Sequence, residues 1–244
     1  MSEVEQRADL FLVHHGFAKS RAEAQDAIRT GRVSADGDAV QKPAQMLRVG
    51  QKITYAPVHD YVSRGGVKLA YALSHFDIDT KDHFCLDVGA STGGFTDVLL
   101  FNGAQHVVCV DVGQNQLHEK LRRDPRITSL ESQDIRSLMA ERLLKKPTRI
   151  VIDASFISLS LILPHIDRLA AEQCELIALI KPQYEAGAAA NKKGIVREII
   201  VHNEVCLKIK AEIENLNWRV RGLVESPITG GSGNHEYLIY ASRL

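Results

Sequence analysis

The 244-residue chain is 45% hydrophobic, enough to bury one large core or two unequal ones. Its 30 Lys and Arg balance 30 Asp and Glu, so global charge gives no support for nucleic-acid binding and any basic surface must be local. Four cysteines without C-x-x-C spacing favour buried reduced thiols over zinc ligands or disulfides. Without an apolar leader or an apolar run of about 18 residues, the sequence predicts a cytoplasmic protein with no stable membrane partner.

The first sixty residues read as a small α+β module. Residues 7–15 carry apolar side chains at helical spacing, and a capping box at residues 20–23 opens a second helix that ends at Gly31. Asp36-Gly37 predicts the turn of a β-hairpin, and residues 52–55 predict a further strand. Two short helices and a small sheet are therefore expected here.

From residue 67 onward, short apolar strands alternate with helices. This alternation predicts an α/β fold, with a mostly parallel sheet that helices cover on both faces and a closing antiparallel pair of strands. The change of pattern predicts a domain over residues 1–58, a linker over 59–62 and a second domain over 63–244. The expected strands are 84–88, 106–111, 126–130, 149–153, 176–181, 218–225 and 236–241, and the expected helices are 94–102, 115–122, 135–144, 158–171 and 197–216.

Residues 85–95, C-L-D-V-G-A-S-T-G-G-F, run from a strand through a small-residue turn into a helix. The glycine spacing differs from G-x-G-x-x-G, which argues against a dinucleotide pyrophosphate. Asp87 would repel phosphates and suits a cationic, amino-bearing ligand, which points to S-adenosyl-L-methionine. A purely structural glycine turn is the alternative. The candidate cofactor contacts in this segment are Asp87, Gly89, Ser91, Thr92, Gly93, Gly94 and Phe95.

Further charged residues fall at strand ends, where ligands bind in doubly wound sheets. Asp111 could accept both ribose hydroxyls, and Asp134 could reach the adenine amino group while Ile135 packs on the ring. Each aspartate taken alone could equally be a helix cap. Asp153 and Lys181 end two more strands.

Lys181 follows a buried apolar run, and desolvation favours the neutral amine that a general base needs. Asp153 could orient it, and Lys68 is the candidate second cation nearby. A surface lysine in a salt bridge with Asp153 is an equally good interpretation of this pair alone.

Five ordered motifs resemble the TlyA (hemolysin A) family of FtsJ-like ribose methyltransferases. They are Y-V-S-R-G-G-V-K-L at 61–69, D-V-G-A-S-T-G-G-F at 87–95, I-D-A-S-F-I-S-L at 152–159, I-K-P-Q-Y-E at 180–185 and G-N-H-E-Y at 233–237. The resemblance implies a Rossmann-like domain with a seven-stranded sheet that uses S-adenosylmethionine to methylate ribose 2′-hydroxyls, at cytidines of 16S rRNA, 23S rRNA or both. The family's Lys-Asp-Lys-Glu tetrad falls on Lys68, Asp153, Lys181 and Glu236. No metal is expected, because the sulfonium is already a good leaving group.

The N-terminal module resembles an S-four RNA-binding domain, which implies ribosomal RNA or assembled ribosomal subunits as the partner. It departs from the usual pattern at Asp36, where asparagine is common before the glycine. A solvated helix face explains the local positive charge equally well. The candidate RNA contacts are Lys19, Arg21, Arg29, Arg32, Arg64, Lys192 and Lys193.

Two rival functions remain open at this point. A membrane-lysing hemolysin would need an amphipathic or spanning segment, and the apolar stripe of residues 197–216 is better explained by a core-facing helix. A non-catalytic RNA-binding assembly factor would keep the fold, but the intact tetrad argues against it. The sequence leaves the oligomeric state open.

Overall fold

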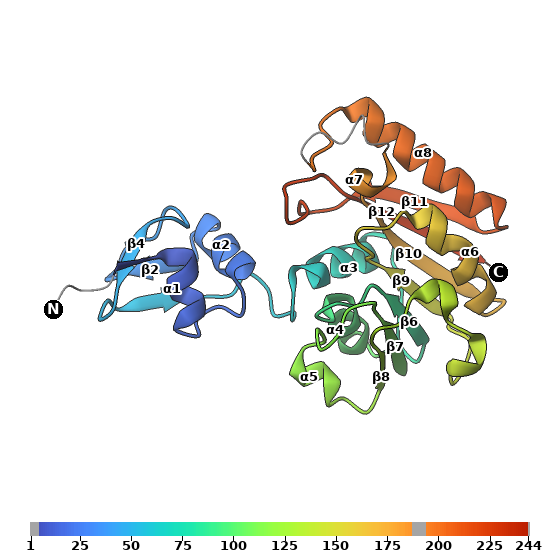
Figure 1. Ribbon diagram of the computed structural model, residues 1–244, viewed down its shortest axis with the longest axis horizontal. Helices are drawn as coiled ribbons and strands as arrows, with labels where there is room; N and C mark the ends of the chain where they lie inside the picture. The colour runs from blue at the N-terminus through green and yellow to red at the C-terminus, as the bar shows by residue number, and fades with distance from the viewer. Residues whose placement is uncertain (1–4, 187–193, 244) are drawn as a thin grey trace. The chain divides into compact units, whose positions relative to one another are not determined.

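The computed structural model describes residues 5–186 and 194–243 and divides the chain into two compact units, Met1–Asp60 and Tyr61–Leu244 (Figure 1). Each unit has its own hydrophobic core. Tyr61 and Val62, expected in the linker, pack on the second unit, where the backbone N–H of Val62 donates to Asp97 Oδ2 over 2.9 Å. In the part of the chain that is described, no helix has the length and apolar character needed to cross a bilayer.

The N-terminal unit packs two helices against two small antiparallel sheets. Asp36 and Gly37 have φ angles of +55° and +96° and form the predicted hairpin turn. The Asp36 carboxylate accepts the backbone N–H of Lys52 over 2.8 Å, so it ties the hairpin to the neighbouring strand. The elements are β1 (Glu5–Arg7), α1 (Ala8–His14), α2 (Arg21–Arg29), β2 (Val33–Ala35), β3 (Asp38–Ala39), β4 (Met46–Arg48) and β5 (Ile53–Tyr55), in sheets β1-β4 and β3-β2-β5.

The predicted capping box of α2 is present, but the Glu23 side chain bonds the backbone N–H of Lys19 in place of that of Ser20. Ser20 Oγ accepts the backbone N–H of Glu23 over 3.2 Å, as a helix N-cap should. The Glu23 carboxylate accepts the N–H of Lys19 over 2.9 Å, one residue before the cap. The pair β1–β4 was not predicted, because three-residue strands carry too little alternation to be recognised.

The second unit contains the predicted seven-stranded sheet, in the order β11-β12-β10-β9-β6-β7-β8. The five strands from β8 to β10 run parallel, and β12 is antiparallel to both of its neighbours. The bounds are β6 (Phe84–Val88), β7 (His106–Val110), β8 (Ile127–Leu130), β9 (Arg149–Ile152), β10 (Cys174–Ile180), β11 (Arg219–Glu225) and β12 (Tyr237–Arg243).

Two layers of helices cover this sheet. Leu86 and Ile150 face a core shared with α6 (Leu159–Leu169) and α8 (Ile199–Asn215). Cys85 and Val151, which neighbour them along the strands, face a core shared with α3 (Arg64–His75) and α4 (Gly94–Phe101). The shorter α5 (Glu119–Arg122) and α7 (Pro182–Glu185) follow strand ends. All four cysteines are free and buried, as predicted.

One expectation for local structure was wrong, and one helix was not predicted. The helix expected over 135–144 is a pair of 3₁₀ turns, Ile135–Ser137 and Ala140–Arg142, because Leu138 and Leu143 take extended backbone and both enter the core. The helix α3 was missed because two glycines occupy its first turn. Gly66 is required there, since a Cβ would lie 2.5 Å from Tyr61 Cβ.

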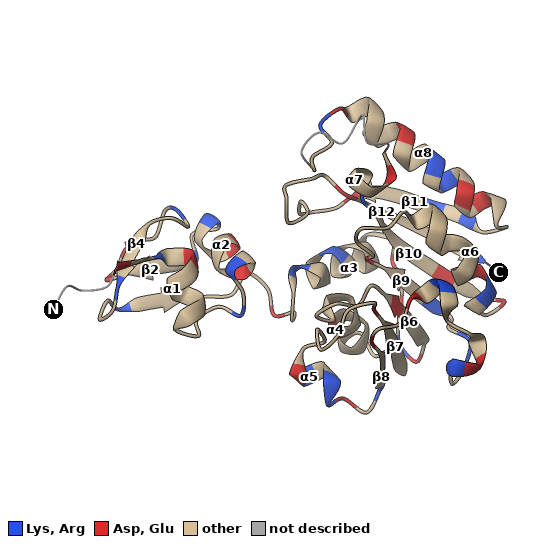
Figure 2. Ribbon diagram, viewed as in Figure 1, with Lys and Arg blue, Asp and Glu red and all other residues tan. Residues whose placement is uncertain are grey.

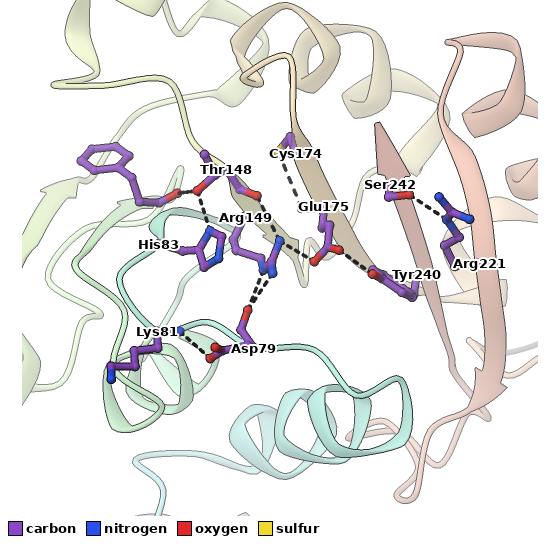
Figure 3. A network of polar contacts seen from close by, with 11 residues as sticks. Asp79, Lys81, His83, Thr148, Arg149, Cys174, Glu175, Arg221, Tyr240 and Ser242 are labelled. Carbon is purple, nitrogen blue, oxygen red and sulfur yellow. Dashed lines mark hydrogen bonds and ion pairs between the residues drawn. The ribbon is translucent and has the colours of Figure 1, made fainter. Parts of the chain in front are cut away.

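A polar network fastens the amino-terminal ends of β9 and β10 (Figure 3). The Arg149 guanidinium donates to the Asp79 carbonyl over 2.7 and 3.0 Å and pairs with Glu175. Tyr240 Oη donates to Glu175 over 2.7 Å, and burial together with this carboxylate raises the pKa of Tyr240 to about 12. The network therefore joins the loop after α3 to three strands.

Candidate active site

The four predicted catalytic residues meet as two ion pairs at one edge of the sheet. Lys181 Nζ lies 2.6 Å from Asp153 Oδ1, and Lys68 Nζ lies 2.6 Å from Glu236 Oε2. Asp153 directly follows β9, Lys181 directly follows β10 and Glu236 directly precedes β12, whereas Lys68 comes from α3. Residues that are 168 positions apart in the sequence are thus joined.

These pairs are largely removed from solvent. Lys68 and Lys181 are each 7% exposed and Glu236 is 3% exposed. A buried ammonium loses its hydration and is tolerated only beside a carboxylate or other acceptors. The pairing therefore allows both ammonium groups to be buried at this edge of the sheet.

The turn before β12 fits closely over Glu236. A Cβ at Gly230 would lie 2.4 Å from Glu236 Oε1, so only glycine lets the turn approach the carboxylate. Asn234 is buried, accepts the N–H of Val196 over 3.0 Å and donates to the Gly194 carbonyl over 2.8 Å. The G-N-H-E-Y motif thus combines an anchoring amide with a carboxylate of the site. The part that Gly230 plays was not predicted from the sequence.

A buried glutamate joins the loops that carry Asp153 and Lys181. Glu185 Oε2 accepts the Ser158 hydroxyl over 2.5 Å, and Glu185 Oε1 accepts the N–H of Leu159 over 2.6 Å at the start of α6. Its side chain is 1% exposed. The last residue of the I-K-P-Q-Y-E motif therefore holds the I-D-A-S-F-I-S-L segment in place.

The glycine turn after β6 passes close to the I-D-A-S-F-I-S-L segment, which carries Asp153. Gly89 has a φ of +80°, and a Cβ there would lie 2.8 Å from the Asp153 carbonyl oxygen. A Cβ at Gly94 would lie 2.2 Å from Ser63 Oγ at the start of α3. Close backbone approach thus requires both glycines, and the positive φ of Gly89 adds a conformational reason. Ser91 has a φ of +47°, and its N–H donates to Asp111 Oδ2 over 2.7 Å.

Two adjoining cavities open along this turn. The larger, of about 1050 Å³, includes Asp111, Asp134 and Ile135 in its lining, together with the aromatic rings of Phe156 and Tyr184. The smaller, of about 180 Å³, is lined by Lys181 and by residues of the turn and of α3. The residues common to both linings are Gly89, Ser91, Asp153 and Ser155; Thr92, Gly94 and Phe95 line the smaller cavity.

The strand-end aspartates have different local partners. Asp111 Oδ1 accepts the N–H of Gly113 over 2.7 Å, which leaves lone pairs of its carboxylate for another donor. Asp134 caps a 3₁₀ turn and binds Arg136, whose guanidinium lowers the pKa of the carboxyl. Gly93 is the N-cap of α4 and has a φ of +91°.

Asp87 lies behind the turn. It is fully buried, its Oδ2 accepts the Thr96 hydroxyl over 2.6 Å, and burial raises the pKa of the carboxyl to about 7. Asp87 is not one of the described residues that line either cavity. Through Thr96 it supports the first turn of α4.

The candidate RNA contacts are mainly exposed basic residues of the N-terminal unit. Arg21 donates to the fully buried Asp9 over 2.8 Å, and Arg7 and Gln25 donate to the same carboxylate. Figure 2 shows basic and acidic residues close together on α2. Lys19 is exposed, Arg29 lies 3.5 Å from Asp26, Arg32 donates to the Pro57 carbonyl, and Arg64 donates to the Thr229 carbonyl; Lys192 and Lys193 lie outside the described residues.

Comparison with protein families agrees with this architecture. The family model of the FtsJ-like methyltransferases matches residues 61–243, and that of the S4 domain matches residues 6–53. This chain belongs to the FtsJ-like methyltransferase family. It is a methyltransferase that carries an S4 domain at its N-terminal side, as the motifs predicted.

Several relatives of this family match nearly the whole chain. The 16S/23S rRNA (cytidine-2′-O)-methyltransferase TlyA of Mycobacterium tuberculosis is 39% identical over 96% of this chain and 88% of its own length. Hemolysin A of Brachyspira hyodysenteriae is 38% identical over 96% and 98%. A solved structure from Streptococcus thermophilus that carries the name hemolysin is 38% identical, covers 99% of this chain and 90% of its own, and has a TM-score of 0.79.

The fold extends to more distant enzymes. A SAM-dependent methyltransferase of Aquifex aeolicus is 17% identical, with a TM-score of 0.53 over 76% of this chain and 95% of its own. The predicted Rossmann-like methyltransferase fold is thereby confirmed.

Proposed function

We propose that this protein transfers a methyl group from S-adenosylmethionine to the 2′-hydroxyl of a cytidine in ribosomal RNA. The observation that carries the proposal is that Asp153 and Lys181 line the cavity at the glycine turn, while Lys68 and Glu236 form a second buried ion pair at the same edge of the sheet. The name of the mycobacterial relative supports the cytidine ribose as the target.

The residues of the turn fit such a cofactor. The small-residue turn at Gly89 leaves room for close backbone approach, and the two cavities offer a narrow space beside a wider one. We assign the narrow space to the methionine end and the wider one to the adenosine. Asp111 would then bind the ribose hydroxyls, while Asp134 and Ile135 would bind adenine. Asp87 would support the turn from behind.

The protein's own groups supply base catalysis and charge stabilisation. Once it has lost its proton, the Lys181 amine accepts the proton of the 2′-hydroxyl, and Asp153 stabilises the ammonium that results. The Lys68 ammonium, held by Glu236, stabilises negative charge that develops on the attacking oxygen. When bound, the cofactor supplies a methyl group on a sulfonium that leaves as a neutral thioether.

Two parts of the protein would contact the RNA: basic residues would hold its phosphates, and the active site would take up the target nucleotide. Arg21 and its exposed neighbours would contact phosphates, which position an RNA without reading its bases. The target nucleotide would be extruded from its stack, because its 2′-hydroxyl must reach a buried lysine. We expect unmodified ribosomal subunits to be better substrates than short free oligonucleotides.

The test is methyl transfer to unmodified ribosomal subunits, with the products mapped by mass spectrometry. The wild type should add a methyl group to a cytidine ribose. Lys181→Ala should abolish transfer and keep cofactor binding by calorimetry, whereas Lys210→Ala on the exposed part of α8 should retain activity. Methylation on a base, or retained turnover in Lys181→Ala, would contradict the proposal.

Two other results would support the rival functions. RNA binding with no transfer by the wild type would favour an assembly factor. Lysis of liposomes by the purified protein would favour the function that the name of the Brachyspira relative suggests.

A further inference from the structure

Ser155 lies outside the predicted tetrad but contacts its proposed base. Lys181 Nζ donates to Ser155 Oγ over 2.8 Å. Ser155 also belongs to the linings of both cavities. We propose that Ser155 is a positioning residue that aims the amine of Lys181 at the substrate hydroxyl; this inference rests on the proposed function.

The direction of the Lys181 lone pair depends on how its hydrogens are held. A neutral amine nitrogen has two N–H bonds and one lone pair, and it turns freely about its last carbon–nitrogen bond unless both hydrogens are held. Ser155 Oγ accepts one of these N–H groups over 2.8 Å. Asp153 Oδ1 lies 2.6 Å from Nζ as an ion-pair partner without hydrogen-bond geometry, and its charge attracts the other hydrogen. The lone pair then points away from both oxygens, whereas without Ser155 its direction would depend on Asp153 alone.

The segment that carries Ser155 is itself held firmly. Gly89 packs against the backbone of Asp153 and Ala154 on one side. Glu185 fastens Ser158 and Leu159 on the other. Phe156, between these anchors, has a φ of +64°, a strained conformation for an aromatic residue that survives where the surroundings enforce it. The hydroxyl of Ser155 is therefore presented by a rigid backbone.

Ser155 is exposed, so its removal should leave the fold intact. In Ser155→Ala we expect kcat for methyl transfer to fall about 10- to 100-fold, the size of effect that misaligned reacting groups produce. The KM values for cofactor and RNA should stay within about twofold, because the hydrogen bond that is lost joins Ser155 to Lys181. Ser155→Thr, which keeps the hydroxyl, should restore most of kcat.

Ser160→Ala is the matched control, since this hydroxyl, in the first turn of α6, bonds Glu212 over 2.9 Å. It should leave kcat unchanged. An alanine variant at 155 with the wild-type kcat, or one in which KM alone changes, would overturn the assignment.

A second measurement does not depend on turnover. Hydrogen exchange of the Lys181 ammonium, followed by NMR in protein with ¹⁵N-labelled lysine, should be slow in the wild type and in Ser155→Thr. It should be faster in Ser155→Ala, and equal rates would refute the contact. If the wild type exchanges slowly but transfers no methyl group to ribose, the proposed function fails while the hydrogen bond stands.

Discussion

Ile180 of β10 lies directly opposite Tyr237 of β12 in antiparallel register. Lys181 and Glu236, the next residues beyond this pair, therefore emerge at the same edge of the sheet. Asp153 emerges there as well, because β9 runs parallel to β10. The register of two strand pairs thus places three of the four predicted catalytic residues.

The pair Lys68–Glu236 allows a test that separates stability from catalysis. Glu236→Gln leaves a buried ammonium without a counter-charge, so we expect a loss of about 3 kcal/mol in unfolding free energy together with lost transfer. The double variant Lys68→Met, Glu236→Gln should regain stability and remain inactive. Urea unfolding and a methyl-transfer assay measure the two effects. Equal stability of the single and double variants would contradict a paired charge.

Gly89→Ala should strain the glycine turn after β6, the proposed cofactor site. The added Cβ would meet the Asp153 carbonyl oxygen at 2.8 Å in a backbone that already has a positive φ. We expect a loss of about 1–3 kcal/mol in stability and at least tenfold weaker cofactor binding by calorimetry. Gly231→Ala is the control, since a Cβ at that position would have no neighbouring atom within 4 Å. Comparable effects of the two substitutions would refute a special role for Gly89.

Ionisation of Asp87 should lower the stability of the protein as the pH rises. The pKa of its carboxyl is raised from 3.8 to about 7, so the folded protein holds a proton that the unfolded chain releases between these values. Unfolding free energy should therefore decrease as pH rises from about 4 to about 7, by about 4 kcal/mol at most from this group. Asp87→Asn cannot ionise and should lack this component. Urea titrations of both proteins at about pH 5 and about pH 8 would show the difference, and parallel pH profiles would exclude it.

Arg149→Ala should destabilise the enzyme without a direct effect on catalysis. It would leave Glu175 and the Asp79 carbonyl without their shared donor (Figure 3). This network lies at the amino-terminal ends of β9 and β10, whereas the proposed catalytic residues Asp153 and Lys181 follow their carboxyl ends. We expect a loss of about 3 kcal/mol in unfolding free energy. Methyl transfer measured well below the melting temperature should be near normal. Arg221→Ala, at an exposed arginine that bonds Ser242, should change stability by less than about 0.5 kcal/mol.

Arg21→Ala should weaken RNA binding in a salt-dependent way. A lost phosphate contact lowers the slope of log affinity against log salt by about one unit. Filter binding of ribosomal RNA at several salt concentrations measures this slope. Arg123→Ala, at an exposed residue paired with Glu119, should leave it unchanged. An unaltered slope in Arg21→Ala would remove Arg21 from the interface.

The sequence predicts the sheet well because each central strand is a short apolar run that ends in a charged residue. Strand β6 matches its expected bounds, Phe84–Val88, because its apolar run is followed directly by the glycine turn. Local side-chain chemistry was harder to foresee. Asp134 binds Arg136, two residues away, and Asp87 turns toward Thr96. Both depend on side-chain direction, which residue spacing does not determine.

Glycines set the other limit of sequence-based prediction. Gly65 and Gly66 lower helix propensity and concealed α3, which supplies Lys68. Packing requires Gly66, where a Cβ would lie 2.5 Å from Tyr61 Cβ, whereas a Cβ at Gly65 would make only an ordinary contact, 3.5 Å from Asp153 Oδ2. Contacts of this kind depend on the tertiary fold and leave no periodic pattern in the sequence.

Glu236, whose carboxylate pairs with Lys68, is synthesised near the end of the chain. Glu236 stands at the head of β12, which inserts between β10 and β11 after all other strands of the sheet have been made. A nascent chain that has emerged only through β11 already carries both lysines and the glycine turn, but it lacks the anion that neutralises Lys68. The Lys68–Glu236 ion pair can therefore form only after β12, the last strand of the sheet, has been made.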